Sequence, residues 1–191
     1  MKDNPKKEKG RLFFLVGASG CGKDSLIDYA RQYLKGSELV FFAHRYITRP
    51  PADGGENHIA LKREEFIKRL EKGFFAMHWQ SHGYHYGIGI EIDYWLVKGC
   101  RVVVNGSRSY LPDAKDRYPN LKVIWIDASP AELKRRLEAR GRETAAQITA
   151  RLDRNRKLKK ALIGTIPDTI TINNDGEIDS AGEMLVKYLS K

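Results

Sequence analysis

Apolar and polar positions alternate in blocks along the chain, in the pattern of strands that take turns with helices. Continuous apolar runs, typical of parallel strands buried on both faces, occupy residues 11–16, 39–43, 102–104, 123–126 and 169–172. Amphipathic helices are predicted from about Lys23, over residues 62–72 up to Gly73, and at the C-terminus. This order predicts an α/β fold with a parallel central sheet covered by helices on both faces. In such a fold the ligand lies beyond the carboxyl ends of the strands.

Two further helix starts carry capping signals. Ser129-Pro130-Ala131-Glu132 combines a capping box with proline at the first helical position. Thr144 to Gln147 repeats the capping-box pattern, and Gly141 and Arg142 separate the two helices. We therefore expect two capped helices joined by a short connection that can move as a flap.

The chain has the size and composition of one globular domain. It has 191 residues, of which 41% are hydrophobic and 30% charged. We expect residues 1–10 to be a flexible tail and residues 11–191 to form the domain. No apolar run reaches the length of a membrane helix, and the charged first ten residues do not form a secretory signal. Because Cys21 and Cys100 lack the spacing of a disulfide framework or a zinc site, we expect a cytoplasmic protein.

The formal net charge of +10 favours anionic ligands. A nucleic-acid interface gathers Lys and Arg with aromatic residues on one face. Here the arginines form separate groups along the chain, at residues 45 and 49, at 108, at 135–142 and at 151–156. This scatter favours a ligand with several phosphates and makes nucleic acid a distant alternative.

One motif identifies a phosphate-binding loop. Gly17-Ala18-Ser19-Gly20-Cys21-Gly22-Lys23 follows a predicted strand, opens a predicted helix and fits the P-loop pattern G-x-x-x-x-G-K. Its glycines let backbone N–H groups turn toward phosphate oxygens, while Lys23 reaches the transferred phosphate. We predict that residues 17–25 bind the phosphates of ATP and that Lys23 is catalytic.

The motif departs from its pattern after the lysine, where Ser or Thr normally binds Mg²⁺. Asp24 occupies this place, and Ser25 follows it. Asp24 either favours the helix N-terminus electrostatically or takes over magnesium ligation with its carboxylate. We favour the second interpretation and predict Asp24 and Ser25 as magnesium ligands.

The segment from His44 to Gly89 resembles the acceptor-binding region of the guanylate kinase family in order and spacing. Its motifs are Tyr46-Ile47-Thr48-Arg49-Pro50, Gly55-Glu56, Arg63-Glu64-Glu65-Phe66 and His82-Gly83-Tyr84-His85-Tyr86-Gly87. The resemblance continues through residues 133–141, Arg151-Leu152 and Asn173-Asn174-Asp175. It implies a P-loop kinase three-layer fold with a small acceptor-binding lobe at about 44–98 and an arginine-rich lid at about 136–152.

The resemblance also assigns roles. It implies that Arg49 and Tyr86 grip the accepting phosphate, through a guanidinium fork and a phenol donor. The lid arginines are predicted to be catalytic, and we expect at least two of them to contact ATP phosphates only after closure; they are Arg136, Arg140, Arg142 and Arg151. Asn105 stands where relatives carry a magnesium-associated carboxylate.

The positions that read guanine in that family differ here. Met77 replaces a glutamate, Arg45 a serine and Ile88 a hydroxyl residue. The family's second phosphate arginine matches Ala52 or a neighbour, and its phosphate-binding tyrosine matches His58. A base pocket that loses its hydrogen-bonding groups and gains a cation no longer selects guanine.

With these exchanges, the sequence resembles the ribose 1,5-bisphosphate phosphokinase family. The shared stretches are His44 to Arg49, Glu56 to Leu61, Tyr86 to Asp93, Val104 to Arg108 and Gly22-Lys23-Asp24-Ser25. The resemblance implies transfer of the ATP γ-phosphoryl group to the 1-phosphate of ribose 1,5-bisphosphate, in phosphonate catabolism or nucleotide-precursor supply. The acceptor's second phosphate then lies where a nucleotide has its base, and Arg45, with Arg108 or His58, is expected to bind it.

Two other functions stay open. One is a nucleoside monophosphate kinase with altered base preference, which Met77 and Arg45 disfavour. The other is a non-catalytic guanylate kinase-like binding module. Such a module need not keep Lys23 or an arginine-rich lid, so their presence favours an enzyme.

Overall fold

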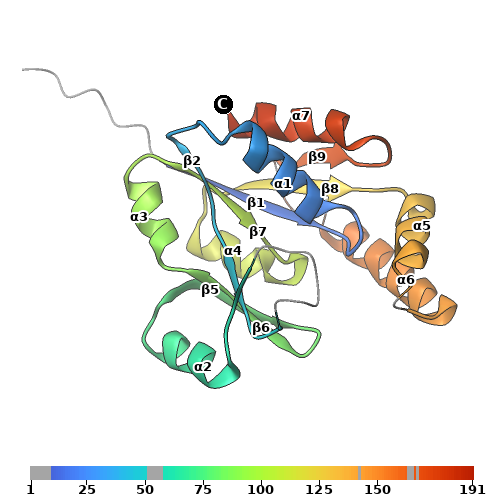
Figure 1. The fold of residues 1–191 in the computed structure, drawn as a ribbon, viewed down its shortest axis with the longest axis horizontal. Helices are drawn as coiled ribbons and strands as arrows, with labels where there is room; N and C mark the ends of the chain where they lie inside the picture. The colour runs from blue at the N-terminus through green and yellow to red at the C-terminus, as the bar shows by residue number, and fades with distance from the viewer. Residues whose placement is uncertain (1–9, 51–57, 142, 163–165, 167) are drawn as a thin grey trace, which may run out of the picture. The chain divides into compact units, whose positions relative to one another are not determined.

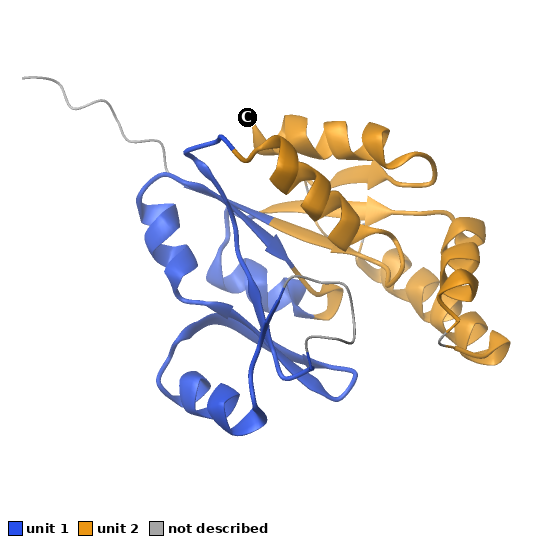
Figure 2. Ribbon diagram, in the orientation of Figure 1, with its two compact units in different colours: residues 1–13, 36–105, 110–121 blue, residues 14–35, 106–109, 122–191 orange. Residues whose placement is uncertain are grey.

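The computed structural model describes residues 10–50, 58–141, 143–162, 166 and 168–191. Of the predicted features, most of the tail, the segment with Ala52 and Gly55-Glu56, and Arg142 lie outside the described residues. The chain divides into two compact units, coloured separately in Figure 2. Unit 1 takes in residues 36–105 and 110–121, and unit 2 takes in residues 14–35, 106–109 and 122–191.

The central sheet has five strands in the order β2-β7-β1-β8-β9 (Figure 1). Its strands are β1 (Arg11–Gly17), β2 (Val40–Phe42), β7 (Arg101–Asn105), β8 (Lys122–Asp127) and β9 (Ile170–Asn173). β2 pairs with β7 and β8 pairs with β9, both in parallel. The predicted parallel sheet with helices around it is confirmed, because long apolar runs such as residues 12–16 are buried on both faces.

The described part of unit 2 includes the α-helices α1 (Lys23–Tyr33), α5 (Pro130–Arg140), α6 (Ala145–Leu162) and α7 (Ile178–Leu189). α1 buries its apolar positions, including Leu26 and Ala30. It packs against α7, where Gly182 leaves room for the ring of Tyr29: a Cβ at Gly182 would lie 2.4 Å from that ring. The periodicity predicted for both helices therefore has a packing partner.

Both predicted capping boxes are present. Ser129 Oγ accepts a hydrogen bond from Glu132 N at 3.2 Å, with Pro130 at the helix start. Before α6, Gln147 N donates to Thr144 Oγ1 at 3.3 Å while Thr144 N donates to Gln147 Oε1 at 2.8 Å. These reciprocal bonds satisfy N–H groups that helix geometry leaves without carbonyl partners.

Unit 1 contains a second sheet that the apolar pattern did not predict. Its order is β4-β3-β6-β5, built from β3 (Arg45–Ile47), β4 (His58–Ala60), β5 (Phe75–Ser81) and β6 (Tyr84–Gly89). β3 pairs with β4 in parallel and with β6 antiparallel, and β5 and β6 form an antiparallel hairpin. The hairpin turns at His82-Gly83, both with positive φ (49° and 80°), as a two-residue turn requires.

One face of this second sheet is covered by α2 (Arg63–Glu71). The ring of Phe66 stacks on Phe75 with centroids 4.5 Å apart, and Tyr46 and Leu61 join the same cluster. Side chains alternate between the two faces of a strand, so residues next to Tyr46 turn to the opposite face. Unit 1 also contains α3 (Glu91–Val97) and α4 (Leu111–Arg117).

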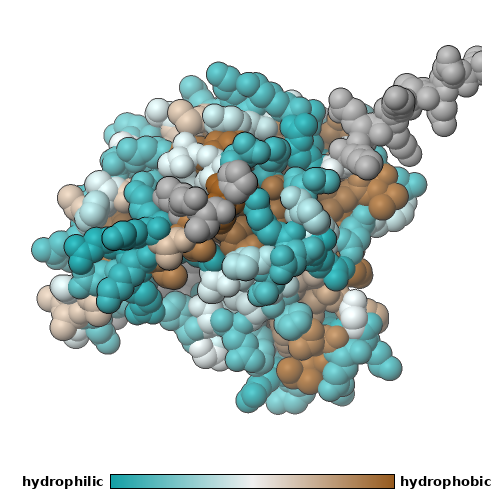
Figure 3. All heavy atoms as spheres, turned by 180° about the vertical axis from the view of Figure 1, so that it is seen from behind, coloured by the Kyte–Doolittle hydropathy of each residue, from teal (hydrophilic) through white to brown (hydrophobic). Residues whose placement is uncertain are grey.

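The surface seen from behind is mostly hydrophilic, and its apolar side chains form separate areas (Figure 3). Among the exposed large apolar residues that the structure describes, Val97 of α3 and Tyr33 of α1 are the most exposed, at 77% and 64%. Within the described chain, no helix combines the length and apolar character needed to cross a bilayer.

Candidate active site

The P-loop joins β1 to α1 and presents backbone donors at the helix start. Gly22 caps α1 with φ of 86°, and the first bond within the helix runs from Leu26 N to Gly22 O at 3.0 Å. A Cβ at Gly22 would lie 2.3 Å from Asn174 Nδ2, so only glycine fits both the conformation and the space. The N–H groups of residues 22–25 precede the first helical bond, and such groups can bind phosphate oxygens.

The side chain of Lys23 contacts the loop that precedes it. Its Nζ lies 3.4 Å from the carbonyl oxygens of Gly17 and Ala18 and 3.9 Å from Cys21 Sγ. Neutral carbonyls and a thiol do not neutralise the ammonium charge, so the loop holds a cation that an anion can recruit. The Cys21 thiol itself is buried and free.

Helix α6, which begins within the predicted lid, reaches the same loop through Arg151. Its Nη1 donates to Ser19 Oγ at 2.9 Å, and its Nη2 pairs with Glu143 at 2.6 Å. These contacts bring together two predicted site residues, Ser19 and Arg151, which are far apart in the sequence. A guanidinium is thereby fixed beside the loop.

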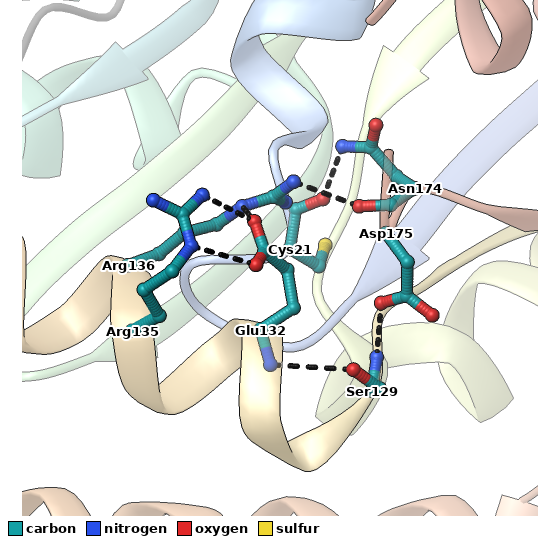
Figure 4. A network of polar contacts seen from close by, with 7 residues as sticks. All are labelled: Cys21, Ser129, Glu132, Arg135, Arg136, Asn174 and Asp175. Carbon is teal, nitrogen blue, oxygen red and sulfur yellow. Dashed lines mark hydrogen bonds and ion pairs between the residues drawn. The ribbon is translucent and has the colours of Figure 1, made fainter. Parts of the chain in front are cut away.

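Arg136 of α5 is held by a network that Figure 4 shows. Its Nε donates to Glu132 at 2.6 Å and its Nη2 to the carbonyl oxygen of Asn174 at 2.8 Å. Its Nη1 is buried and, among the described residues, has no hydrogen-bond partner. That nitrogen lies near the loop, 3.4 Å from where a Cβ of Gly22 would be. An unpaired guanidinium nitrogen at a P-loop is suited to a phosphate oxygen.

The network also ties the loop to the end of β9. Asn174 Nδ2 donates to Cys21 O at 2.8 Å, and Asp175 accepts from Ser129 N at 2.6 Å (Figure 4). The backbone bond from Ser129 lowers the pKa of Asp175. Glu132 serves both Arg135 and Arg136, and the hydrogen bonds from Arg135 and then Arg136 hold its pKa at about 2.

The other lid arginines are placed differently. Arg140, at the end of α5, is exposed, and Arg142 is not among the described residues. Arg108 lies in the short helix η2 (Arg108–Tyr110) and donates from Nη2 to Asn155 Oδ1 of α6 at 2.7 Å. Arg108 therefore belongs with the P-loop and lid in unit 2, whereas the other predicted acceptor residues lie in unit 1.

Three of the acceptor residues predicted in unit 1, Arg45, His58 and Tyr86, share the face of the second sheet opposite α2. Arg45 stands opposite His58 on β4 and Ile88 on β6, while Ile47 stands opposite Tyr86. Residues paired across strands point to the same face, and so do residues two apart along one strand. Arg45, His58 and Tyr86 therefore project from one surface.

Aromatic stacking orders this surface. The Arg45 guanidinium carbon lies 5.6 Å from the centre of the Tyr86 ring, within cation–π range. Tyr86 stacks on Trp79 with centroids 5.6 Å apart, and Trp79 stacks on Tyr110 at 5.5 Å. His58 Nε2 donates to the carbonyl oxygen of Arg49 at 3.2 Å, which ties β4 to the segment after β3.

The positions that resemble guanine readers hold an apolar pair. Met77 and Ile88 are paired across β5 and β6, and neither has exposed surface (0% each). A thioether and an alkyl chain supply no hydrogen bonds to a purine edge. The surface near Tyr86 therefore combines a cation with an apolar floor.

A metal at this site would need oxygen donors close to the P-loop. Within the described residues, no three His, Cys, Asp or Glu side chains gather into a cluster. Mg²⁺ in phosphate-transfer sites usually takes only one or two carboxylates, with phosphate and water completing the shell. Asp24 and Ser25 lie at the second and third positions of α1, beside the loop's N–H groups. Their oxygens fit a magnesium ion bound together with phosphates.

Comparisons with known proteins give one consistent result. The chain is 53% identical over 182 residues to the ribose 1,5-bisphosphate phosphokinase PhnN of Thiobacillus denitrificans, covering 95% of this chain and 94% of that protein. The protein of the same name from Burkholderia mallei is 50% identical, covering 94% and 95%. This chain belongs to the ribose 1,5-bisphosphate phosphokinase family. No model of a protein family matches the chain.

A solved structure supports the fold of this family member. The guanylate kinase of Anaplasma phagocytophilum superposes with a TM-score of 0.70 at 18% identity, over 96% of this chain and 86% of that one. The resemblance predicted from the sequence, to a phosphokinase family within guanylate kinase-like P-loop kinases, is confirmed in family and in fold.

Sequence reasoning missed the side chains that hold the predicted cations. Glu132 was assigned only to a capping box, although its spacing of four residues from Arg136 is the signal for a pair on one helix face. Asn155 was not singled out, although it falls at an apolar position of α6, seven residues after Ile148. Polar residues at such positions need partners, and those partners were not visible in the local sequence.

Proposed function

We propose that this chain transfers the γ-phosphoryl group of ATP to the 1-phosphate of ribose 1,5-bisphosphate, giving 5-phosphoribosyl 1-diphosphate. The observation that carries the proposal is the acceptor surface, where Arg45 lies over Tyr86 beside the buried Met77–Ile88 pair. A cation in place of base-reading groups suits an acceptor with a second phosphate.

On the donor side, the P-loop binds the ATP phosphates through the N–H groups at the start of α1. Lys23 leaves its carbonyl contacts and neutralises charge on the transferred group. Arg136 offers its unpartnered Nη1, and Arg151 reaches the same loop from α6. Arg140 and Arg142 join them when the lid closes, which also excludes water.

On the acceptor side, Arg49 and Tyr86 hold the 1-phosphate, and Arg45 holds the 5-phosphate with His58, its neighbour across β3 and β4. An oxygen of the 1-phosphate attacks the γ-phosphorus, the bond to the β-phosphate oxygen breaks, and ADP leaves. A phosphate acceptor is ionised near neutral pH, so no general base is needed.

Asp24 and Ser25 are the residues that would hold Mg²⁺ together with ATP oxygens and water. The ion supplies charge neutralisation for the phosphates. Asn105, buried at the end of β7, leaves that strand end without a carboxylate. We propose that the carboxylate of Asp24 in the P-loop replaces the one that relatives carry at the strand end.

The proposal is tested by ATP consumption with ribose 1,5-bisphosphate, GMP or AMP as acceptor. We expect turnover with ribose 1,5-bisphosphate and little with either nucleotide. A preference for GMP or AMP would indicate a nucleoside monophosphate kinase. No consumption with any of the three, by protein that binds ATP, would indicate a binding module.

A further inference from the structure

A polar side chain occupies an inward position of helix α6. Ile148 and Asn155 are its buried residues, with 3% and 8% of their surface exposed. They are seven residues apart, about two turns, and so lie on one side of the helix. Asparagine is uncommon at such a position unless its amide is hydrogen-bonded.

The amide oxygen of Asn155 accepts a hydrogen bond from Arg108 Nη2 at 2.7 Å. A guanidinium has only donors, so the oxygen must face Arg108 and the Nδ2 group must point elsewhere. This Nδ2 is buried and finds no hydrogen-bond partner among the described residues. A buried donor without an acceptor lowers stability, so folding alone does not account for Asn155.

Arg108 has further donors to offer. Asn155 is its hydrogen-bond partner in the described part of the chain, and no described carboxylate pairs with it. Each Arg108 nitrogen is either hydrogen-bonded or accessible to solvent, where a ligand can reach it. Burial lowers the pKa of Arg108, while Cys21 raises it and Arg154 lowers it electrostatically. Lys23 Nζ lies 3.9 Å from the same Cys21 thiol, so Cys21 interacts with both cations.

We propose that Asn155 is a positioning residue, which holds Arg108 so that its remaining guanidinium nitrogens face a substrate phosphate beside Cys21 and Lys23. The phosphate belongs either to ATP or to the acceptor. The proposal rests on the proposed function only in assuming that Arg108 binds a substrate phosphate. Arg151 lies four residues before Asn155 on α6. The same helix therefore carries one arginine, which bonds to Ser19 of the P-loop, and the asparagine that holds a second arginine, Arg108.

The test compares Asn155→Ala, Arg108→Ala and the double variant. Asn155→Ala should lower kcat/KM about tenfold, and Arg108→Ala about a hundredfold, because the second removes the charge itself. The double variant should be no worse than Arg108→Ala, since Asn155 acts through Arg108. Asn155→Ala should keep or raise Tm, because it removes an unsatisfied buried donor.

Two further variants sharpen the test. Asn155→Asp keeps the size and the acceptor atom but pairs with the Arg108 charge, so it should lose more activity than Asn155→Ala. Arg156→Ala removes a cation from the exposed side of α6, where Arg156 pairs with Asp153, and should change kcat/KM less than twofold. A raised KM for ATP or for the acceptor identifies the source of the phosphate.

Additive losses in the double variant would overturn the proposal, as would unchanged turnover in Asn155→Ala or a loss matched by a lower Tm. Calorimetric titration with MgATP and with inorganic phosphate measures the role of Asn155 in binding phosphate, independently of which acceptor the protein phosphorylates. If the wild type did not use ribose 1,5-bisphosphate, the proposed function would fail. Weaker binding of either probe by Asn155→Ala and Arg108→Ala, but not by Arg156→Ala, would still support the role of Asn155. Equal affinities for both probes would contradict it.

Discussion

The two compact units position their cations in different ways. In unit 2, Arg136 and Arg151 are each held by acceptors from two places in the chain, Glu132 with Asn174 and Ser19 with Glu143. In unit 1, Arg45 lies over an aromatic ring on a sheet face set by strand register. The first arrangement fixes guanidinium groups in place, which suits a triphosphate that many kinases bind. The second can change its ligand by exchanging side chains on one face, without altering the fold.

The largest effect is expected in the P-loop, where Lys23→Ala removes the charge that we propose neutralises the transferred group. We expect kcat to fall about a thousandfold or more, because such a charge acts mainly in the transition state. Steady-state kinetics measures the loss, and circular dichroism checks the fold. Lys35→Ala, which removes an exposed lysine just after α1, is the matched control. Near-normal turnover of Lys23→Ala would refute the catalytic role of the loop.

The acceptor face is tested by Arg45→Ser. A charge-assisted hydrogen bond is worth about 1.5–3 kcal/mol, so kcat/KM for ribose 1,5-bisphosphate should fall roughly tenfold to a hundredfold. GMP should gain little, because the Met77–Ile88 pair still offers no hydrogen bonds. The comparison substrate is ribose 1-phosphate, which lacks the 5-phosphate.

Arg69→Ser is the control for that variant. Arg69 lies over the Tyr46 ring at 5.4 Å, on the face of the same sheet that α2 covers. Arg69→Ser should leave kcat/KM unchanged for both ribose 1,5-bisphosphate and ribose 1-phosphate. If Arg45→Ser reduced activity equally on substrates with and without a 5-phosphate, its assignment to that phosphate would be wrong.

A smaller effect is expected where the P-loop departs from its pattern. Asp24→Asn should raise the Mg²⁺ concentration for half-maximal rate about tenfold, because a carboxylate ligand is lost. The double change Asp24→Ser with Asn105→Asp should recover part of the activity. Asp28→Asn, on an exposed residue one turn further along α1, is the control. A change in Tm with unchanged magnesium dependence would make Asp24 a helix-terminal charge instead.

The smallest effect is a pH dependence at Glu132. Its pKa is lowered from 4.5 to about 2, first by Arg135 and then by Arg136, so its stabilising contribution is present above about pH 4.5 and lost as the pH falls toward 2. Glu132→Gln should therefore lower Tm at neutral pH, and the difference from wild type should shrink across that range. Glu138→Gln, whose pair with Lys134 is exposed and longer at 3.8 Å, is the control. A Tm difference that stayed constant with pH would contradict the pairing.

The contrast between the units also explains what the sequence could predict. The central strands and the P-loop helix follow from contiguous apolar runs and one local motif, and they were found. The second sheet was missed because β3 and β4 have only three residues each, and β6 mixes polar and glycine positions. Asn155 was missed as the partner of Arg108 because the two are 47 residues apart, and only the tertiary fold brings them together. The pairing of Glu132 with Arg136 did have a local signal, their spacing of four residues.

The central claim is that a diphosphate forms at carbon 1 of the sugar. The direct measurement is ³¹P NMR of ribose 1,5-bisphosphate incubated with the protein, ATP and Mg²⁺. The account predicts loss of the ATP β- and γ-signals and of the sugar 1-monophosphate signal. The two coupled signals of ADP should appear together with two further coupled signals of the sugar diphosphate, while the 5-monophosphate signal stays unchanged. A diphosphate at position 5, or ATP consumption that leaves both sugar phosphates unmodified, would contradict it.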